Sequence, residues 1–185
     1  IARICHNGKI DLAKLMAGSE GTLAVFTKIT LKTVPLPPVK ALLQLEFDSL
    51  GKMARAVPII VDSGVVTCDV MDKNVIKLAI ESLPEYRDIL PTGAEVVLLI
   101  EHTGGNQEQV QEKIDKTGSA VGTLASGRSV FFEPRQQKRV WKSRRDAVPL
   151  LYRVKSKKHP VEFIEDISVD NTKLAEYVAG LERIK

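Results

Sequence analysis

The sequence has few cysteines, few aromatic residues and no long apolar run, and each shortage excludes a class of protein. Its two cysteines, Cys5 and Cys68, are too few and too far apart for a disulfide scaffold, an iron–sulfur cluster or a structural zinc site. The three histidines stand at no spacing typical of a metal site. No apolar stretch approaches the ~20 residues that a membrane-spanning helix needs. We therefore expect no transmembrane segment, and the cysteine count is compatible with a reducing compartment.

The familiar catalytic motifs are missing as well. The chain contains no Gly-x-Ser-x-Gly elbow, no Walker loop and no Gly-x-Gly-x-x-Gly pattern, so nucleophilic hydrolysis and dinucleotide binding of the Rossmann type have little basis. The chain begins at Ile1 without an initiator methionine or a signal-peptide layout, and it ends abruptly at Lys185. We interpret these ends as signs of a piece of a longer protein.

What the chain does have is an ordinary globular composition with an uneven distribution of charge. It is 44% hydrophobic and 27% charged, and its formal net charge is +4. Residues 135–158 hold ten basic residues and one acidic residue, Asp146, so this stretch alone carries a charge of +9. Such a block attracts anions, which include phosphates, nucleic acids, acidic proteins and carboxylate substrates. The alternative is a basic helix face that is simply solvated.

The apolar pattern predicts alternating strands and helices after a proline-rich boundary at residues 35–38. Caps at Ser49, Asp72 and Asp170 mark three of the helix starts. Alternation favours a parallel α/β sheet, whereas short linkers and half-polar strands allow an antiparallel sheet with helices on one face. The expected strands are 23–31, 39–47 (half-buried), 65–71, 95–102 (covered on both faces), 120–125 and 161–169. The expected helices are 49–64, 72 onwards, 105–117, 134–152 and 170 onwards.

One basic residue of the expected helix 134–152 stands out, because Arg144 falls inside an apolar stripe. An arginine on a buried stripe costs several kcal/mol unless an anion or another acceptor meets it, and its planar fork suits a carboxylate. Arg144 could therefore clamp an acidic substrate. Alternatively, it could form a structural ion pair with an internal acid such as Glu165, or extend to water. The stripe consists of Val140, Trp141, Ala147, Val148 and Leu151.

A second candidate is the turn over residues 18–22, directly before the expected strand 23–31. Its two glycines allow the backbone to turn sharply and to approach a ligand, while its hydroxyl groups and N–H groups can bind phosphate or ribityl oxygens. The carboxylate of Glu20 argues against a site for phosphate alone. A simple connecting turn is the alternative. The residues are Gly18, Ser19, Glu20, Gly21 and Thr22.

Three stretches together resemble a known family. Residues 11–32, which contain the Gly-Ser-Glu-Gly-Thr-Leu motif, and the following Pro-Leu-Pro resemble the end of the FAD-binding domain in FAD-linked 2-hydroxyacid oxidases and dehydrogenases. This family includes the glycolate oxidase D-subunit and D-lactate dehydrogenase. Residues 140–147 resemble the Trp-x-x-Arg helix of its C-terminal substrate domain, and residues 165–169 resemble the strand that follows.

The resemblance implies a fold, a domain division and site residues. Residues 1–36 would be the C-terminal tail of the FAD-binding domain, and 39–185 the substrate-binding domain, truncated at its C-terminus. The implied fold is α+β, with a ferredoxin-like antiparallel sheet and helices on one face. Arg144 would bind the substrate carboxylate. The FAD site would be lined by Gly18, Ser19, Glu20, Gly21 and Thr22.

The implied reaction moves a hydride from a 2-hydroxy acid of the glycolate or D-lactate type to FAD, giving a 2-oxo acid. Electrons would then pass to a partner such as an iron–sulfur protein. The protein would be cytoplasmic, or it would associate with a membrane through that partner. The 185 residues lack the body of the FAD-binding domain and the Gly-His-x-Gly-Asp-Gly-Asn-x-His stretch that holds the family's metal-binding and catalytic histidines. We therefore expect an incomplete FAD site, no metal site and no activity of the chain alone, and we assign no catalytic residue.

A different class of function is a stand-alone α+β module that uses residues 135–158 to bind RNA or an acidic protein. Several lysines and arginines would supply phosphate contacts. The expected strands, however, lack interleaved aromatic residues that could stack on bases, and Arg144 lies on the apolar rather than the exposed face. We therefore expect no nucleic-acid partner.

Overall fold

The computed structural model of the chain describes residues 4–6, 8–151 and 167–184. These residues form two compact units, 1–36 and 37–185, with the division inside the proline-rich stretch.

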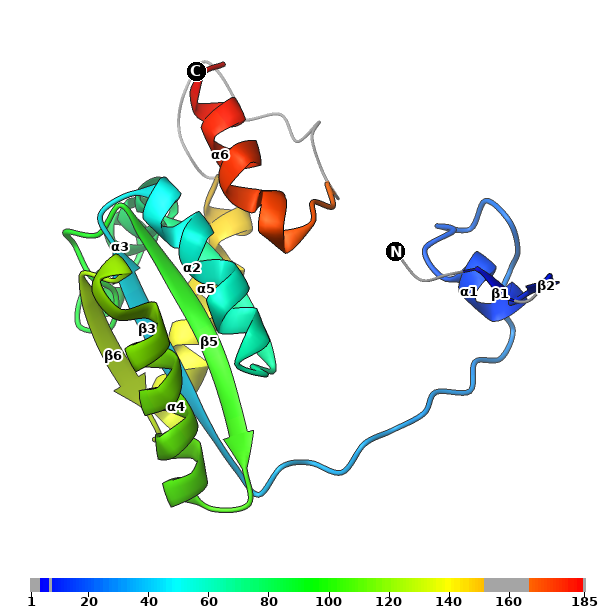
Figure 1. Cartoon of the computed structure of the whole chain (residues 1–185), viewed down its shortest axis with the longest axis horizontal. Coiled ribbons are helices and arrows are strands. Elements are labelled where there is room, and N and C mark those ends of the chain that lie inside the picture. The colour runs from blue at the N-terminus through cyan, green and yellow to red at the C-terminus, as the bar shows by residue number, and fades with distance from the viewer. Residues whose placement is uncertain (1–3, 7, 152–166, 185) are drawn as a thin grey trace. The chain divides into compact units, whose positions relative to one another are not determined.

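The second unit is built on a four-stranded antiparallel sheet (Figure 1). In the sheet the strands lie in the order β4-β5-β3-β6, so the first strand of the unit, β3, is central. Residue Leu43 of β3 lies opposite Ile100 of β5 on one side and Val130 of β6 on the other. The strands are β3 (Val39–Phe47), β4 (Thr67–Asp72), β5 (Val96–Gly104) and β6 (Gly127–Phe131).

Helices connect these strands and follow the β-α-β-β-α-β order typical of ferredoxin-like folds, with one further helix inserted between β4 and β5. Because β5 lies between β3 and β4 and is antiparallel to both, α2 joins two parallel strands that are not neighbours. The helices of this unit are α2 (Leu50–Asp62), α3 (Lys73–Ser82), α4 (Gln107–Val121), α5 (Pro134–Leu151) and α6 (Leu174–Glu182). Short 3-10 turns occupy η1 (Pro84–Tyr86), η2 (Gly122–Leu124) and η3 (Asn171–Lys173).

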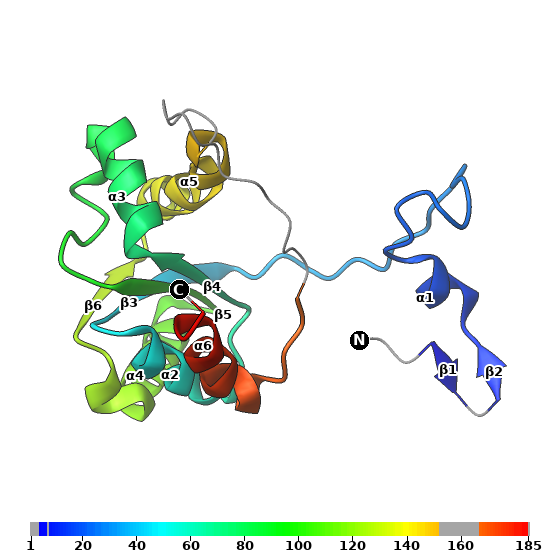
Figure 2. The ribbon, with the colours of Figure 1, turned by 90° about the horizontal axis from the view of Figure 1, so that it is seen from above.

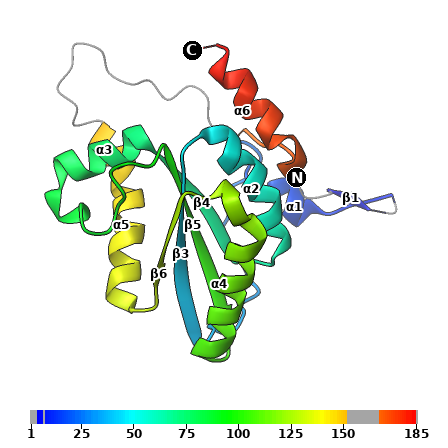
Figure 3. The same ribbon diagram turned by 60° about the vertical axis from the view of Figure 1, so that its left-hand side comes forward.

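The α+β class and the antiparallel sheet are confirmed, but helices cover both faces of the sheet instead of one. Leu43, Leu45 and Phe47 pack with α2 and α4, whereas Leu42 and Leu99 pack with α3 and α5 on the opposite face. Figures 2 and 3 show the two helix pairs on either side of the sheet. The physical reason is that β3 and β5 bury consecutive residues, so both of their faces need cover. For the same reason β3 is not the half-buried strand that its alternation predicted.

Most helix starts follow the sequence because short polar side chains cap them. The Ser49 and Asp72 side chains accept the backbone N–H groups of Lys52 and Val75, as the sequence predicted. Asn106 caps α4 in the same way. Asp170 accepts the backbone N–H of Thr172 at the start of η3, which leads into α6.

Two expected strands differ from the structure. The predicted strand over residues 120–125 is wrong, because the apolar spacing Val110, Ile114, Val121 continues the buried face of α4 and the strand begins later, at Gly127. The predicted strand over 161–169 falls mostly outside the described residues, and residues 167–169 are not in a strand.

The first unit contains little regular structure. A hairpin of β1 (Cys5–His6) and β2 (Lys9–Ile10) precedes the single helix α1 (Leu12–Met16), and no helix or strand follows up to residue 38. The predicted strand over 23–31 is therefore wrong, because no neighbouring strand pairs with this segment in the described unit. Its apolar side chains are exposed: Leu23, Val25, Phe26, Ile29 and Leu31.

Candidate functional site

The basic helix α5 is docked by its apolar side onto the sheet and α3. Val140 and Ser143 are fully buried, and Trp141 packs at the edge of the same core. This part of the predicted apolar stripe is confirmed, whereas the structure describes only the helical backbone, not the side chains, of Ala147, Val148 and Leu151. Arg144 therefore projects from a helix whose position is fixed by packing.

The side chain of Arg144 is half-buried and binds an acid on the edge strand. Its Nε donates to Oδ1 of Asp69 on β4 at 3.1 Å, and the two side chains are 34% and 37% exposed. The sequence left open a structural ion pair, and Asp69 provides one. Glu165, the partner considered there, lies outside the described residues. The terminal guanidinium nitrogens of an arginine held at Nε still form a planar pair of donors suited to a second carboxylate.

Other cations of α5 also have partners inside the domain. Arg139 binds both carboxylate oxygens of Asp88, at 2.9 and 3.1 Å, and donates to the carbonyl of Glu85. Lys142 lies 2.6 Å from the carboxylate of Asp146. These contacts neutralise part of the basic block and argue against α5 as a free phosphate-binding face.

Lys142 and Asp146 meet a buried phenol in a network that the sequence analysis missed. The Tyr86 hydroxyl donates to Asp146 at 2.6 Å and accepts from Lys142 at 3.0 Å, and Tyr86 is 1% exposed. Desolvation, followed by the bond to Asp146, raises the pKa of Tyr86, whereas the bonds from Lys142 and Tyr86 lower the pKa of Asp146. The only signal in the sequence was that Asp146, the single acid of the basic block, lies one helical turn after Lys142. The network fastens α5 to η1.

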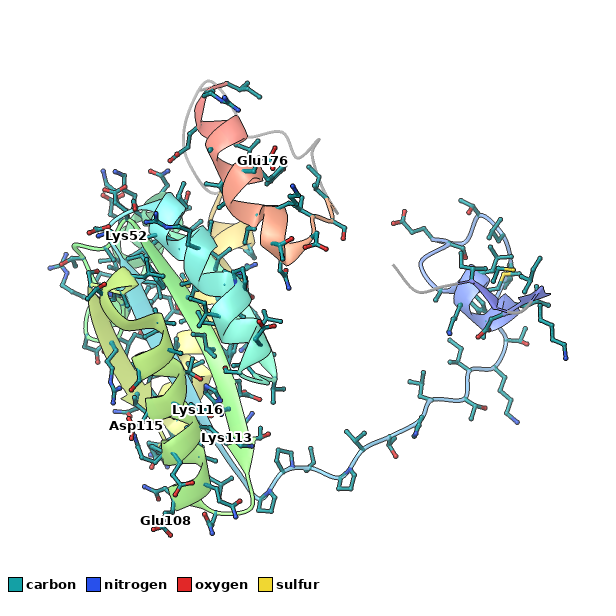
Figure 4. All side chains as sticks on the ribbon, in the orientation of Figure 1. Lys52, Glu108, Lys113, Asp115, Lys116 and Glu176 are labelled. Carbon is teal, nitrogen blue, oxygen red and sulfur yellow. The ribbon has the colours of Figure 1, made fainter. Side chains whose placement is uncertain are left out.

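On the other face of the sheet, the buried His102 of β5 lies at the end of a chain of hydrogen-bonded hydroxyl groups. Its Nε2 lies 3.2 Å from Oγ1 of Thr117 on α4, which lies 3.0 Å from Oγ of Ser63 at the end of α2. The Nδ1 atom of His102 is buried and has no partner among the described residues. Desolvation lowers the pKa of His102, and the charge of Lys113 lowers it further. Lys113 lies on α4 (Figure 4), and its Nζ donates to the carbonyl of Thr103 on β5 at 2.7 Å.

The buried His102 predicts a pH dependence of stability. Because its folded pKa is depressed, the unfolded chain binds the proton more readily, and the free energy of unfolding should decrease as the pH falls below about 6.5. Urea unfolding of the wild type and of His102→Gln at pH 7.5 and pH 5.5 would measure this. The variant should lose most of the difference between the two pH values. An equal difference in both proteins would contradict the prediction.

The turn over residues 18–22 lies in the first unit and is sharply bent. Gly18, Glu20 and Gly21 have positive φ angles of 81°, 48° and 77°. The two glycines adopt them freely, whereas Glu20 does so at a cost of about 1 kcal/mol. Thr22 donates from both its backbone N–H and its hydroxyl to the carbonyl of Ser19, at 2.8 and 2.6 Å. The turn thus has a defined conformation, which is compatible both with a ligand site and with a simple connecting turn.

The same turn has features that fit part of a cofactor site. The hydroxyl oxygen of Ser19 is buried and has no hydrogen-bond partner among the described residues, so it can bind a polar ligand atom. The turn borders a cavity of about 650 Å³ whose apolar walls include Met16, Phe26 and Ile29. A hydroxyl group beside apolar walls suits a ligand with both ring and polar parts, as FAD has. Arg144 belongs to the other unit.

The described residues also show what they lack for metal binding and for membrane insertion. Within them, no three histidine, cysteine or acidic side chains are grouped so that they could hold a metal ion. None of the helices in this part of the chain is long and apolar enough to cross a membrane.

Comparisons with known proteins match most of the chain to one family. Residues 36–184 match the family described as FAD linked oxidases, C-terminal domain. The chain is 28% identical over 184 residues to D-2-hydroxyglutarate dehydrogenase of Escherichia coli (strain K12), covering 92% of this chain and 18% of that protein. It is 32% identical over 184 residues to glycolate oxidase subunit GlcD of Bacillus subtilis (strain 168), covering 94% and 36%. The chain therefore spans a fifth to a third of the length of these curated relatives.

Proposed function

Since the chain belongs to the family of FAD linked oxidase C-terminal domains, we propose that it is the substrate-binding part of an oxidoreductase that converts a 2-hydroxy acid into a 2-oxo acid. In this proposal residues 39–185 belong to the substrate domain, and residues 1–36 are the end of the FAD-binding domain. The observation that carries the proposal is Arg144, a half-buried arginine held in place on a packed helix. The matched relatives named for glycolate and for D-2-hydroxyglutarate support the substrate class.

Arg144 would bind the carboxylate that all 2-hydroxy acids share. Its planar pair of donors would fix the acid in one orientation. Because helix α5 is packed against the sheet, the guanidinium group would stay in place and so would position the bound acid. Gly18, Ser19, Glu20, Gly21 and Thr22 would contribute to the FAD site, where the buried Ser19 hydroxyl has a donor and an acceptor to offer. The hydride-accepting chemistry would come from FAD when it is bound. An iron–sulfur partner would then take the electrons.

Anaerobic reduction of the flavin tests this function. The polypeptide that carries this chain together with a FAD-binding domain should lose its oxidised flavin absorbance when glycolate, D-lactate or D-2-hydroxyglutarate is added. At least one of these acids should reduce the flavin, and one molecule of the corresponding 2-oxo acid should form for each flavin reduced. If dithionite bleaches the flavin and none of the acids does, the proposed function is wrong. Tight binding of the 185-residue chain to RNA would instead support the binding module considered from the sequence.

A further inference from the structure

A second residue lies beside the proposed carboxylate site. Asp69 is on β4, an edge strand of the sheet, opposite Leu99 of β5. Leu99 belongs to the core beneath α3 and α5, so the Asp69 side chain faces the same side of the sheet as α5. This placement brings it to Arg144 although 75 residues separate them in sequence.

The Asp69 carboxylate is itself fixed. Its Oδ1 accepts the backbone N–H of Val70 at 2.8 Å and the Nε–H of Arg144 at 3.1 Å. A single oxygen therefore connects the guanidinium to the backbone of the sheet. Because Asp69 binds the Nε–H of Arg144, it orients the plane of the guanidinium group from one edge. The two terminal nitrogens at the other end of the group form the pair of donors that a carboxylate accepts.

We propose that Asp69 is a positioning residue that orients Arg144 for the substrate carboxylate, an inference that rests on the proposed function. The contribution comes from orientation and not from charge. A negative charge on Asp69 would weaken the attraction between Arg144 and an anionic substrate, and both side chains are exposed enough for water to screen that charge. An arginine that is free to rotate, in contrast, loses side-chain entropy when it binds substrate.

Two substitutions separate orientation from charge. Asp69→Ala removes both the charge and the acceptor, whereas Asp69→Asn keeps an oxygen that can accept from Nε and from the Val70 N–H. In the FAD-containing polypeptide we expect Asp69→Ala to raise the KM for the active 2-hydroxy acid about tenfold and to change kcat by less than about twofold. The reason is that the Arg144 side chain, no longer held by Asp69, must be ordered when the substrate binds, and a tenfold change corresponds to about 1.4 kcal/mol of binding free energy. Asp69→Asn should restore the KM to within about threefold of the wild type.

The matched control is Asp88, which also pairs with an arginine of α5 but lies at the η1 end of the domain. Asp88→Ala should leave the KM unchanged even if it lowers the melting temperature. A second readout uses the 185-residue chain with isotope-labelled arginine. The Nε–H resonance of Arg144, identified by its loss in Arg144→Lys, should shift and exchange faster with water in Asp69→Ala, and it should return towards the wild type in Asp69→Asn.

The outcomes distinguish the inference from the function beneath it. If Arg144→Lys leaves the KM for the 2-hydroxy acid unchanged, the proposed role of Arg144 in binding the substrate carboxylate fails, and the inference about Asp69 fails with it, whereas the proposed reaction is tested separately by the flavin reduction. If Arg144→Lys raises the KM but Asp69→Ala does not, the inference alone is overturned. An equal rise for Asp69→Ala and Asp69→Asn would also overturn it, since an uncharged acceptor at the same place would then fail to restore substrate binding. So would a full tenfold effect of Asp69→Ala in the Arg144→Lys background, since Asp69 would then act elsewhere.

Discussion

Replacing Phe47 by alanine is expected to destabilise the second unit by about 4 kcal/mol, the largest stability effect that we predict for a single residue. Phe47 is fully buried at the end of the central strand β3, where it packs in the core under α2 and α4. The truncation removes a large apolar surface from that core and leaves a cavity that the fixed strand β5 opposite cannot close. Since domains of this size are stable by about 5–15 kcal/mol, the variant should lose a large part of its stability.

Urea unfolding followed by circular dichroism would measure the loss of stability in Phe47→Ala. The matched control is Leu181→Ala on α6, where the side chain is 43% exposed. That variant should change the free energy of unfolding by less than about 1 kcal/mol. A Phe47→Ala midpoint close to that of the control would show that the sheet core is not packed as described.

Replacing Arg144 by alanine is expected to raise the KM for the 2-hydroxy acid about 100-fold in the FAD-containing polypeptide. Loss of a bidentate, charge-assisted pair with the substrate carboxylate corresponds to about 2.7 kcal/mol, which is two factors of ten in affinity. Arg144→Lys keeps the charge but not the planar fork, so it should recover less than tenfold of the loss. Steady-state kinetics with each active acid would give these values.

The matched control for Arg144 is its neighbour Arg145, which has the same charge and lies on the exposed side of α5. Arg145→Ala should change the KM by less than about threefold, because only screened, long-range attraction is lost. Lys142 is a poorer control, since its removal also breaks the contacts with Tyr86 and Asp146. If Arg144→Ala and Arg145→Ala raise the KM equally, general charge attraction explains substrate binding and the carboxylate clamp is wrong.

The sequence predicted the features of the fold that depend on nearby residues. Caps at Ser49 and Asp72 are local hydrogen bonds, and the apolar run of β5 reports burial on both faces directly. The segment 23–31 has an equally apolar pattern, yet it forms no strand, because a strand also needs a neighbour and the pattern of one segment cannot supply it. The cover on both faces of β3 likewise depends on where α3 and α5 dock.

The candidate site shows the same limit. The stripe around Arg144 could be found from helical spacing, but its partner Asp69 could not, because the pairing depends on the order and register of strands far apart in sequence. Tyr86 was missed for this reason too, since a single buried phenol in a short turn has no periodic pattern around it. The positive φ angle of Glu20 also could not be read from the sequence, because a glutamate does not favour that conformation.

The central position of β3 has a consequence for how the domain folds during synthesis. Leu43 leaves the ribosome long before Ile100 and Val130, its neighbours in the sheet. The strand β3, the first of this unit to be made, therefore cannot pair until β5 and β6 have also been made. Such distant pairings raise the contact order and make folding slower than that of a helical bundle of the same size. Until β5 and β6 have been made, the apolar run Leu42, Leu43 and Leu45 has no neighbouring strand on either side, which makes it a segment of this domain prone to aggregate.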